Sequence, residues 1–295
     1  MKNNMRKIKK AVIAAAGYGT RFLPATKVQP KEMLPIVDKP IIQYLVEEAV
    51  ASGIEDIIIV TRAGNQALED HFDSSIELEN YLQNQEKLDK LEETRKIPNL
   101  ANFVYVRQKR NYPYGNATPL LCVKNLIDDD EAFVYMFGDD LIKSKVPGVL
   151  QLIKVREKNP AAFVSAFQEV PLSEVNRYGI AKLKSGTKDN ELEYIVEKPD
   201  IDKAPSNFAQ DGRFILDYRI YWILENLKTG IGNELWLADA LREAAKQFKV
   251  LAHPVEGSWV TTGDPLRYMQ AAVKYSLDRE DIGEEFREYL RSLEL

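Results

Sequence analysis

The stretch KAVIAAAGYGTRFLP, residues 10–24, decides the fold of this chain. Its first six residues form a short, mostly apolar run, which predicts a buried strand. Gly17 and Gly19 follow at once, and Arg21 comes two residues later. Glycine lets the backbone turn its N–H groups toward a nearby ligand, and arginine pairs well with phosphate oxygens. The stretch therefore predicts a strand that ends in a phosphate-binding loop, although an ordinary tight turn has the same composition.

Two common phosphate-binding motifs do not match this loop. A P-loop ends in Gly-Lys followed by Ser or Thr, and no such run occurs in the chain. The dinucleotide-binding motif needs a third glycine, where this chain has Phe22. The two glycines alone are therefore weak evidence for any one ligand.

Short β-rich runs alternate with helical patterns in the first half of the chain, an order typical of a mostly parallel sheet covered by helices. The expected strands are Lys10–Ala15, Asp56–Thr61, Phe103–Arg107 and Phe133–Phe137. Ile41–Ser52 repeats apolar residues at helical spacing and Gly53 ends it, so this helix connects two parallel strands. The charged run Ser75–Lys96 has Leu and Tyr three or four residues apart, which predicts one amphipathic surface helix. These patterns predict an α/β fold with a Rossmann-like, mostly parallel (mixed) central sheet flanked by helices.

The second half of the chain has a helix at Val149–Glu157 and then strands joined by long loops. The expected strands are Ala162–Gln168, Gly179–Leu183, Glu191–Glu197 and Arg213–Leu216. Loops on a rigid sheet are where a second ligand is usually held, so this part predicts a smaller β region that binds a substrate. The chain beyond Asp264 is charged and helical in pattern, which predicts a tail for packing or oligomer formation.

Composition argues against several classes of protein. With 40 basic and 45 acidic residues the net charge is -5, so the chain has no general attraction for nucleic acid or anionic lipid. No apolar run approaches the ~20 residues that cross a bilayer, which predicts no membrane segment. The lone Cys122 cannot form an internal disulfide, and this favours a reducing compartment and hence the cytoplasm. His71 and His253 lack metal-ligand spacing, so zinc is not expected.

A longer pattern surrounds the glycine loop and reaches beyond Lys31. The runs GYGTRFLPATK (residues 17–27) and PKEMLPIVDKPIIQY (residues 30–44) resemble the signature G-x-G-T-R followed by P-K-x-x-L-P of sugar-1-phosphate nucleotidyltransferases. The resemblance is closest to bacterial UTP:glucose-1-phosphate uridylyltransferases. It implies uridylyl transfer from UTP to glucose 1-phosphate, with Arg21 and Lys31 as catalytic residues that neutralise the triphosphate. A solvated lysine would be the ordinary interpretation of Lys31 taken alone.

The same resemblance implies where the nucleotide binds. Gln108 reads the pyrimidine edge, because an amide both donates and accepts hydrogen bonds, and Gly115 lies beside the base. The other nucleotide-binding residues that it implies are Ala16, Gly17, Gly19 and Thr20. The run Asn116–Pro119 departs from the Gly-His-Ala that is usual in these enzymes. Because glutamine reads uracil and thymine alike, thymidylyl or other nucleotidyl transfer to a different sugar 1-phosphate stays open as an alternative.

Asp139 and Asp140 follow an expected strand at its carboxyl end, which is the ligand side of an α/β sheet. Capping of a turn is as good an interpretation of these two acids alone. The resemblance favours Mg²⁺ as a cofactor, with Asp139 as its ligand and Asp140 in support. Related enzymes have a second acid where this chain has Thr261. Three explanations stay open: Asp264 supports the metal instead, water and phosphate complete its shell, or the chain is a catalytically weak regulatory paralogue that binds the same ligands.

Three later motifs resemble the sugar-phosphate loops of the same enzymes. They are RYGI (residues 177–180), VEKP (residues 196–199) and APSN (residues 204–207) leading to Gly212. By this resemblance Gly179 lets the hexose approach the backbone, Glu197 accepts hydrogen bonds from its hydroxyls, and Lys198 is catalytic and holds the phosphate. Gly212 belongs to the same sugar-phosphate set. Adjacent Glu and Lys residues are more often a surface ion pair, so these roles depend on the resemblance.

The resemblance covers nearly the whole chain, and no linker or repeat divides it. It implies one catalytic domain over residues 1–263, with a nucleotide-binding half at about 1–145 and a sugar-phosphate-binding half at about 146–263. Residues 264–295 form the helical segment for packing or oligomerisation. The implied partners are the two small-molecule substrates and further copies of the chain in a homo-oligomer, with no nucleic acid and no membrane.

Overall fold

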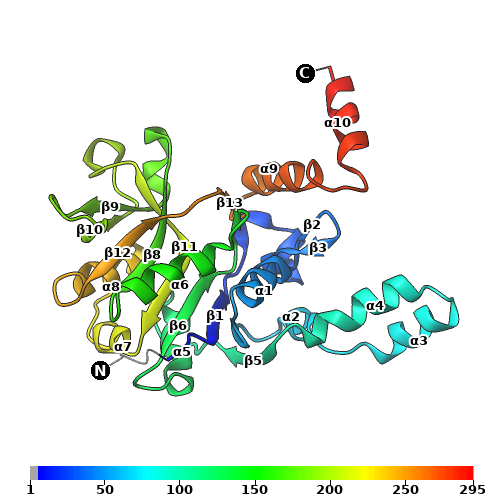
Figure 1. Ribbon diagram of the computed structural model, residues 1–295, viewed down its shortest axis with the longest axis horizontal. Coiled ribbons are helices and arrows are strands. Elements are labelled where there is room, and N and C mark those ends of the chain that lie inside the picture. The colour runs from blue at the N-terminus through cyan, green and yellow to red at the C-terminus, as the bar shows by residue number, and fades with distance from the viewer. Residues whose placement is uncertain (1–5, 295) are drawn as a thin grey trace.

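A nine-stranded sheet runs through the body of the protein (Figure 1), in a computed structural model that describes residues 6–294. Its strands are β1 (Lys10–Ala15), β4 (Asp56–Thr61), β5 (Asn102–Arg107), β6 (Ala132–Phe137), β8 (Phe163–Glu169), β9 (Gly179–Leu183), β10 (Leu192–Glu197), β11 (Phe208–Asp217) and β12 (Val250–Pro254). The main path has the order β10-β9-β11-β6-β1-β4-β5, while β8 pairs with both β11 and β12. Strands β6, β1, β4 and β5 are parallel and β11 joins β6 antiparallel, so the sheet is mixed.

β1 lies at the centre of the parallel part of the sheet, between β4 and β6. Side chains alternate between the two faces of a strand. Ala11, Ile13 and Ala15 therefore enter one buried cluster, and Val12 enters the other. A strand that is buried on both faces needs an unbroken apolar run, which is why this stretch predicts a strand so clearly.

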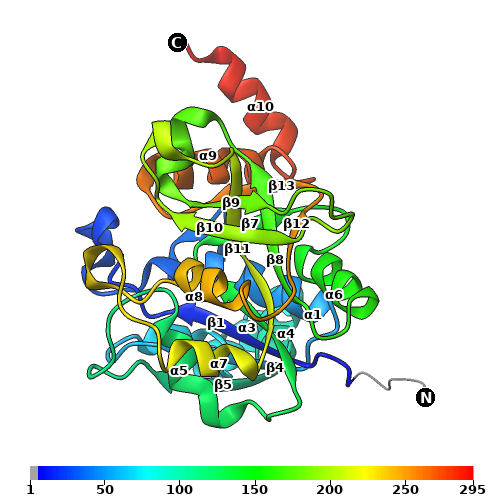
Figure 2. The same cartoon turned by 90° about the vertical axis from the view of Figure 1, so that its left-hand side faces the viewer.

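Helices cover both faces of the sheet (Figure 2). One face is packed by α1 (Ile41–Ala51), α2 (Gln66–His71) and α6 (Gly148–Lys158). The other is packed by α5 (Thr118–Val123), α7 (Arg219–Leu224) and α8 (Leu237–Ala244). The expected α/β class with a mixed central sheet between helices is confirmed.

Two short antiparallel sheets complete the strands. They are β7 (Asp140–Lys143) with β13 (Ser258–Thr261), and β2 (Pro35–Ile36) with β3 (Lys39–Pro40). The β7–β13 pair sets Asp140 opposite Thr261 and so brings two distant parts of the chain together. The sequence analysis did not predict it, because strands of four residues are too short to show a clear period.

Most predicted strands and helices match the structure within a residue or two. The shortest predicted strand and the longest predicted helix are the two exceptions. β11 runs from Phe208 to Asp217, whereas only Arg213–Leu216 was expected. Its register against β8 shifts between Gln210 and Phe214, and this irregularity interrupts the apolar pattern.

The prediction of a single helix over Ser75–Lys96 is wrong. The chain forms two helices there, α3 (Ile76–Asn84) and α4 (Leu88–Lys96). Glu86 lies between them with a left-handed φ of 55°, so the chain turns back at this point.

The α3–α4 hairpin stands away from the body of the protein (Figure 1). Leu82 and Leu91, one from each helix, are buried. Arg95 Nε lies 2.8 Å from Glu79 Oε2 and joins the two helices. Folding back lets each helix shield the few apolar side chains of the other, which a single straight helix with one thin apolar stripe does not achieve.

The chain ends in two helices, α9 (Pro265–Ser276) and α10 (Gly283–Ser292), as expected for the residues after Asp264. α10 projects from the body in both views (Figures 1 and 2). Within residues 6–294 no helix is both long and apolar enough to span a membrane. Residues 1–5, which open the predicted nucleotide-binding half, and Leu295 lie outside the described residues.

Candidate active site

One cleft of about 910 Å³ opens where the parallel strands end. The predicted site residues that line it are Ala16, Gly17, Gly19, Thr20, Arg21, Lys31, Gln108, Gly115, Asp139, Asp140, Gly179, Glu197, Lys198 and Asp264. The loops after β1, β5 and β6 enter this cleft together because the carboxyl ends of parallel strands meet at one edge of a sheet. Residues that the sequence analysis assigned to nucleotide, metal and sugar phosphate therefore share one space.

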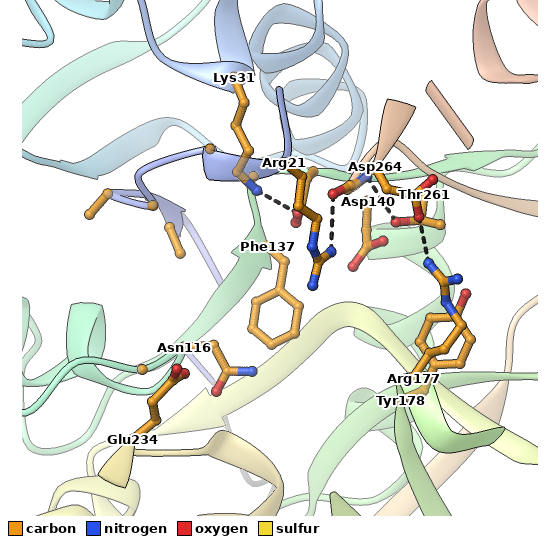
Figure 3. Close-up of a pocket in the computed structure, with 18 of the residues that line it drawn as sticks. Arg21, Lys31, Asn116, Phe137, Asp140, Arg177, Tyr178, Glu234, Thr261 and Asp264 are labelled. Carbon is orange, nitrogen blue, oxygen red and sulfur yellow. Dashed lines mark hydrogen bonds and ion pairs between the residues drawn. The ribbon is translucent and has the colours of Figure 1, made fainter. Parts of the chain in front are cut away.

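Lys31 and Arg21 both extend into the cleft (Figure 3), which Asp139 also lines. Lys31 Nζ donates a hydrogen bond to Asp139 Oδ2 at 2.5 Å, and Arg21 Nη1 donates one to the carbonyl oxygen of Gly263 at 3.1 Å. Burial opposes the charge on Lys31, but Asp139 and Glu32 outweigh it and raise the pKa of Lys31 above its ordinary value. Burial also opposes the charge on Asp139, yet Lys31 and Arg21 hold its pKa below the ordinary value. Lys31 and Asp139 are thus both charged near neutral pH.

Asp140 differs from Asp139 although the two are neighbours. Its side chain is buried, and its Oδ1 accepts a hydrogen bond from Trp259 Nε1 at 2.9 Å. Burial and the charge of Asp139 raise the pKa of Asp140 to about 6. Gly212 packs directly against it, since a Cβ atom on Gly212 would lie 2.8 Å from Asp140 Oδ2. The structure therefore sets Gly212 behind the cleft, where it makes room for Asp140, and not among the residues that line the cleft surface.

The carboxylate of Asp264 reaches the cleft but already has partners. Its Oδ2 lies 2.5 Å from Arg177 Nη2 and 3.1 Å from Arg267 Nη1. Burial would raise the pKa of Asp264, but hydrogen bonds from Arg267 and Arg177 lower it. Asp140 and Asp264, the two expected supports for a metal, are therefore both engaged by the protein. In the part of the chain that the structure describes, no three acidic, His or Cys side chains gather as a metal cluster.

The loop after β5 carries Gln108 and Gly115 into the cleft. Gly115 has a φ of 143°, and a Cβ atom there would collide with the backbone of Leu235. Only glycine permits this close approach between the two chain segments. Gly115 therefore has a packing role, in addition to the position next to the base that the sequence predicts.

The contact at Leu235 joins the two halves of the chain. Leu235 N donates to Tyr114 O at 2.7 Å, and Ala117 N donates to Leu235 O at 3.0 Å. Asn116 Oδ1 accepts a hydrogen bond from Leu237 N at 2.8 Å. Asn116, which departs from the family pattern, thus fixes the first turn of α8 to the loop after β5.

Three of the residues predicted to bind the sugar phosphate, Gly179, Glu197 and Lys198, lie where β9 and β10 pair. Gly179 and Glu197 stand opposite each other in this ladder. Burial raises the pKa of Glu197 to about 7, against the opposing effect of Lys198. Lys198 Nζ lies 3.7 Å from Glu197 Oε1 and 4.0 Å from the ring centroid of Trp236. The Lys198 side chain borders the cleft and is 36% exposed, and its backbone has a left-handed φ of 45°.

Several cleft residues have no role in the predictions made from the sequence. They are Glu32, Tyr114, Asn176, Gln210, Glu234, Trp236 and Trp259. Glu32 is buried, both its carboxylate oxygens lack a hydrogen-bond partner among the described residues, and burial raises its pKa to about 7. For the two tryptophans, the rarity of this residue type was a signal in the sequence. The chain has only three, and two of them border this cleft.

The chain belongs to the nucleotidyl transferase family, whose model matches residues 10–277. A UTP–glucose-1-phosphate uridylyltransferase from Staphylococcus epidermidis is 43% identical over 293 residues, which cover 99% of this chain and 100% of that protein. A protein of the same name from Bacillus subtilis is 41% identical over 290 residues, 98% of each chain.

Solved structures agree with these relatives. The crystal structure of a UDP-glucose pyrophosphorylase complexed with UDP-glucose matches with a TM-score of 0.83 and 40% identity, over 92% of this chain and 100% of that one. A UTP-bound UGPase from Acinetobacter baumannii matches with a TM-score of 0.88 and 34% identity, over 98% of this chain and 100% of that one. The shared fold therefore extends over both ends of the cleft.

Proposed function

We propose that the protein transfers the uridylyl group of UTP to glucose 1-phosphate and releases UDP-glucose and pyrophosphate. The observation that carries the proposal is the single cleft, which Arg21 and Lys31 enter from one half of the chain and Lys198 from the other. Similarity to uridylyltransferases over nearly the full chain supports this choice of substrates.

The reaction is a displacement at phosphorus. A phosphate oxygen of glucose 1-phosphate forms a bond to the α-phosphorus of UTP. The bond from that phosphorus to the oxygen bridging to the β-phosphorus breaks, and its electron pair leaves with pyrophosphate. A phosphate monoester is already anionic near neutral pH, so no protein nucleophile is required. Catalysis then depends on positioning and on neutralising charge.

Each end of the cleft has its own task in this mechanism. Arg21 and Lys31 stabilise the departing pyrophosphate, while Lys198 holds the attacking phosphate in line. Glu197 accepts hydrogen bonds from the hexose hydroxyls once it is ionised. The groups that hold the uridine are the Gln108 side chain and the backbone near Ala16, Gly17, Gly19, Thr20 and Gly115.

Asp139 is the side chain that would hold Mg²⁺. Its lowered pKa keeps it anionic, and its side chain is 28% exposed toward the cleft, whereas Asp140 and Asp264 are taken by protein partners. One carboxylate suits this ion, because Mg²⁺ commonly completes its shell with water and phosphate oxygens. When bound, the ion supplies positive charge to the phosphates. Lys31, whose Nζ lies beside Asp139, would supply further positive charge to the pyrophosphate.

A substrate panel tests the proposed function. Purified protein is mixed with UTP, dTTP, ATP or GTP and with one of several sugar 1-phosphates, and pyrophosphate release is measured with and without Mg²⁺. We expect the fastest release with UTP, glucose 1-phosphate and Mg²⁺ together. Faster release with dTTP would support the thymidylyl alternative, and tight UTP binding without turnover at any Mg²⁺ concentration would support the regulatory one.

We also propose a cytoplasmic homo-oligomer. α10 projects from the body, and Tyr289 and Leu293 in and after it are 58% and 39% exposed, so apolar surface is left for a second copy. Light scattering after size-exclusion chromatography measures the mass of the assembly directly. A mass of about one chain, 33.7 kDa, at working concentration would contradict this part of the proposal.

A further inference from the structure

Two tyrosines stand at the nucleotide end of the cleft and have no role in the function proposed above. Tyr18 lies between the two glycines of the loop after β1, and Tyr114 directly precedes Gly115 in the loop after β5. Both line the cleft. Their ring centroids are 6.1 Å apart with an angle of 27° between the ring planes. Loops about a hundred residues apart thus present one stacked aromatic surface, the Tyr18–Tyr114 wall.

The wall is open to solvent although it is aromatic. Tyr18 is 61% exposed and Tyr114 is 46% exposed. Aromatic rings have a large apolar area to bury, so a ligand that covers them gains binding energy. Exposed rings that face a cleft therefore point to a ligand more strongly than the same rings on an open surface.

Each ring is also held in place before any ligand binds. The Arg62 guanidinium carbon lies 5.3 Å from the ring centroid of Tyr18, a cation–π arrangement. The Tyr114 hydroxyl reaches the opposite loop, since a Cβ atom on Gly17 would lie 3.8 Å from it. The carbonyl of Tyr114 accepts the hydrogen bond from Leu235 N at 2.7 Å. A surface that is fixed in advance loses little entropy on binding.

We propose that the Tyr18–Tyr114 wall stacks against the pyrimidine ring of the nucleotide and adds selection for a flat base to the hydrogen bonds of Gln108. This inference rests on the proposed function, from which it takes the identity of the nucleotide end. Of the groups in the two substrates, the base is the flat, weakly polar one. The triphosphate is charged, and the hexose belongs at the other end of the cleft beside Glu197.

Binding of UTP and of tripolyphosphate, which lacks a base, tests the wall. Both are titrated by calorimetry, with Mg²⁺ present, into the wild type and into Tyr114→Leu and Tyr18→Leu. Base stacking on an aromatic side chain predicts that each leucine variant weakens UTP binding by roughly 5- to 150-fold, while tripolyphosphate binding stays unchanged. Tyr114→Phe and Tyr18→Phe keep the rings and are expected to bind UTP like the wild type.

Tyr81→Leu is the matched control, because Tyr81 is 54% exposed but lies on α3, outside the cleft. We expect it to bind UTP normally. Equal losses for UTP and tripolyphosphate would overturn the inference, since the tyrosines would then act on the phosphates. Unchanged UTP binding in both leucine variants would overturn it as well. A wild type that fails to bind UTP would instead contradict the proposed function.

Discussion

The two ends of the cleft are built in different ways. At the end proposed to bind the nucleotide, Arg21 and Lys31 come from one continuous stretch, residues 10–31, that folds as a strand and its following loops. At the end proposed to bind the sugar phosphate, the adjacent Glu197 and Lys198 lie at the end of β10, Gly179 comes from β9, and Trp236 directly precedes α8. One local stretch therefore supplies both cations of the first end, whereas the second end is assembled from segments that only tertiary packing brings together. The contact of Gly115 with Leu235 joins them.

The largest expected effect separates the two ends by their kinetics. Lys31→Ala and Lys198→Ala each remove a charge contact in the cleft, which commonly costs about 3 to 4 kcal/mol, or roughly a hundredfold to a thousandfold in kcat. We expect Lys198→Ala to raise the KM for glucose 1-phosphate as well, and Lys31→Ala to leave that KM nearly unchanged. Initial rates of pyrophosphate release over a range of both substrates measure this difference.

Lys90→Ala is the control for these two variants, because Lys90 pairs only with the exposed Glu93 on α4. It should leave both kinetic constants as they are. If Lys31→Ala and Lys198→Ala kept wild-type rates, neither end of the cleft would have its assigned task.

The next effect concerns the joint between the two ends. Gly115→Ala forces a methyl group into the backbone of Leu235 at a φ of 143°, so we expect a loss of roughly 3 to 4 kcal/mol in the free energy of unfolding. Gly186→Ala is the matched control, with a φ of 76° and no atom near the added methyl group. It should cost only about 1 kcal/mol. Urea unfolding compares them, and similar losses in both would show that the Leu235 contact is not tight.

A third prediction concerns pH and the sugar end. The pKa of Glu197 is about 7 in the folded protein against an ordinary 4.5, because burial disfavours its charge. At pH well above 7 the carboxylate is charged in both states, so the folded state bears a cost that disappears as the pH falls toward 4.5. Glu197→Gln should therefore stabilise the protein at about pH 8, by up to about 3 kcal/mol, and progressively less at lower pH. Unfolding curves at several pH values measure the gap, and a gap that widens on acidification would contradict the assignment.

The smallest effect concerns Asn116. Asn116→Ala leaves Leu237 N without its partner, which should cost about 1 to 2 kcal/mol of unfolding free energy. Asn116→Asp keeps an acceptor oxygen in place and should cost less. Hydrogen exchange of the Leu237 amide reports the contact directly, and equal exchange rates in wild type and Asn116→Ala would show that the bond does not form.

The same contrast explains how far sequence reasoning reached. The central strand, the glycine loop, Arg21 and Lys31 are predictable because period, turn chemistry and charge all lie within one short stretch. The α/β class and most strands follow from the same patterns. Apolar strands that are buried on both faces occur almost only in parallel sheets with helices on both sides, so these patterns restrict the fold to few classes.

The site residues that could not be predicted from the sequence are those whose position depends on contacts with distant parts of the chain. Trp236 beneath Lys198 and Asn116 beside Leu237 have no local signal, since their partners are 38 and 121 residues away along the chain. The β7–β13 pair is too short to show a period. The packing of Gly212 against the Asp140 carboxylate is likewise a contact between distant parts of the chain.

A crystal structure of this protein with UDP-glucose tests the central claim most directly, namely that both ends form one working cleft. We expect the uracil beside Gln108 and Gly115 and against the Tyr18–Tyr114 wall, with the glucose beside Gly179 and Glu197 and the diphosphate near Lys198. UDP-glucose bound elsewhere, or with its glucose turned away from Glu197 and Lys198 into solvent, would contradict the account.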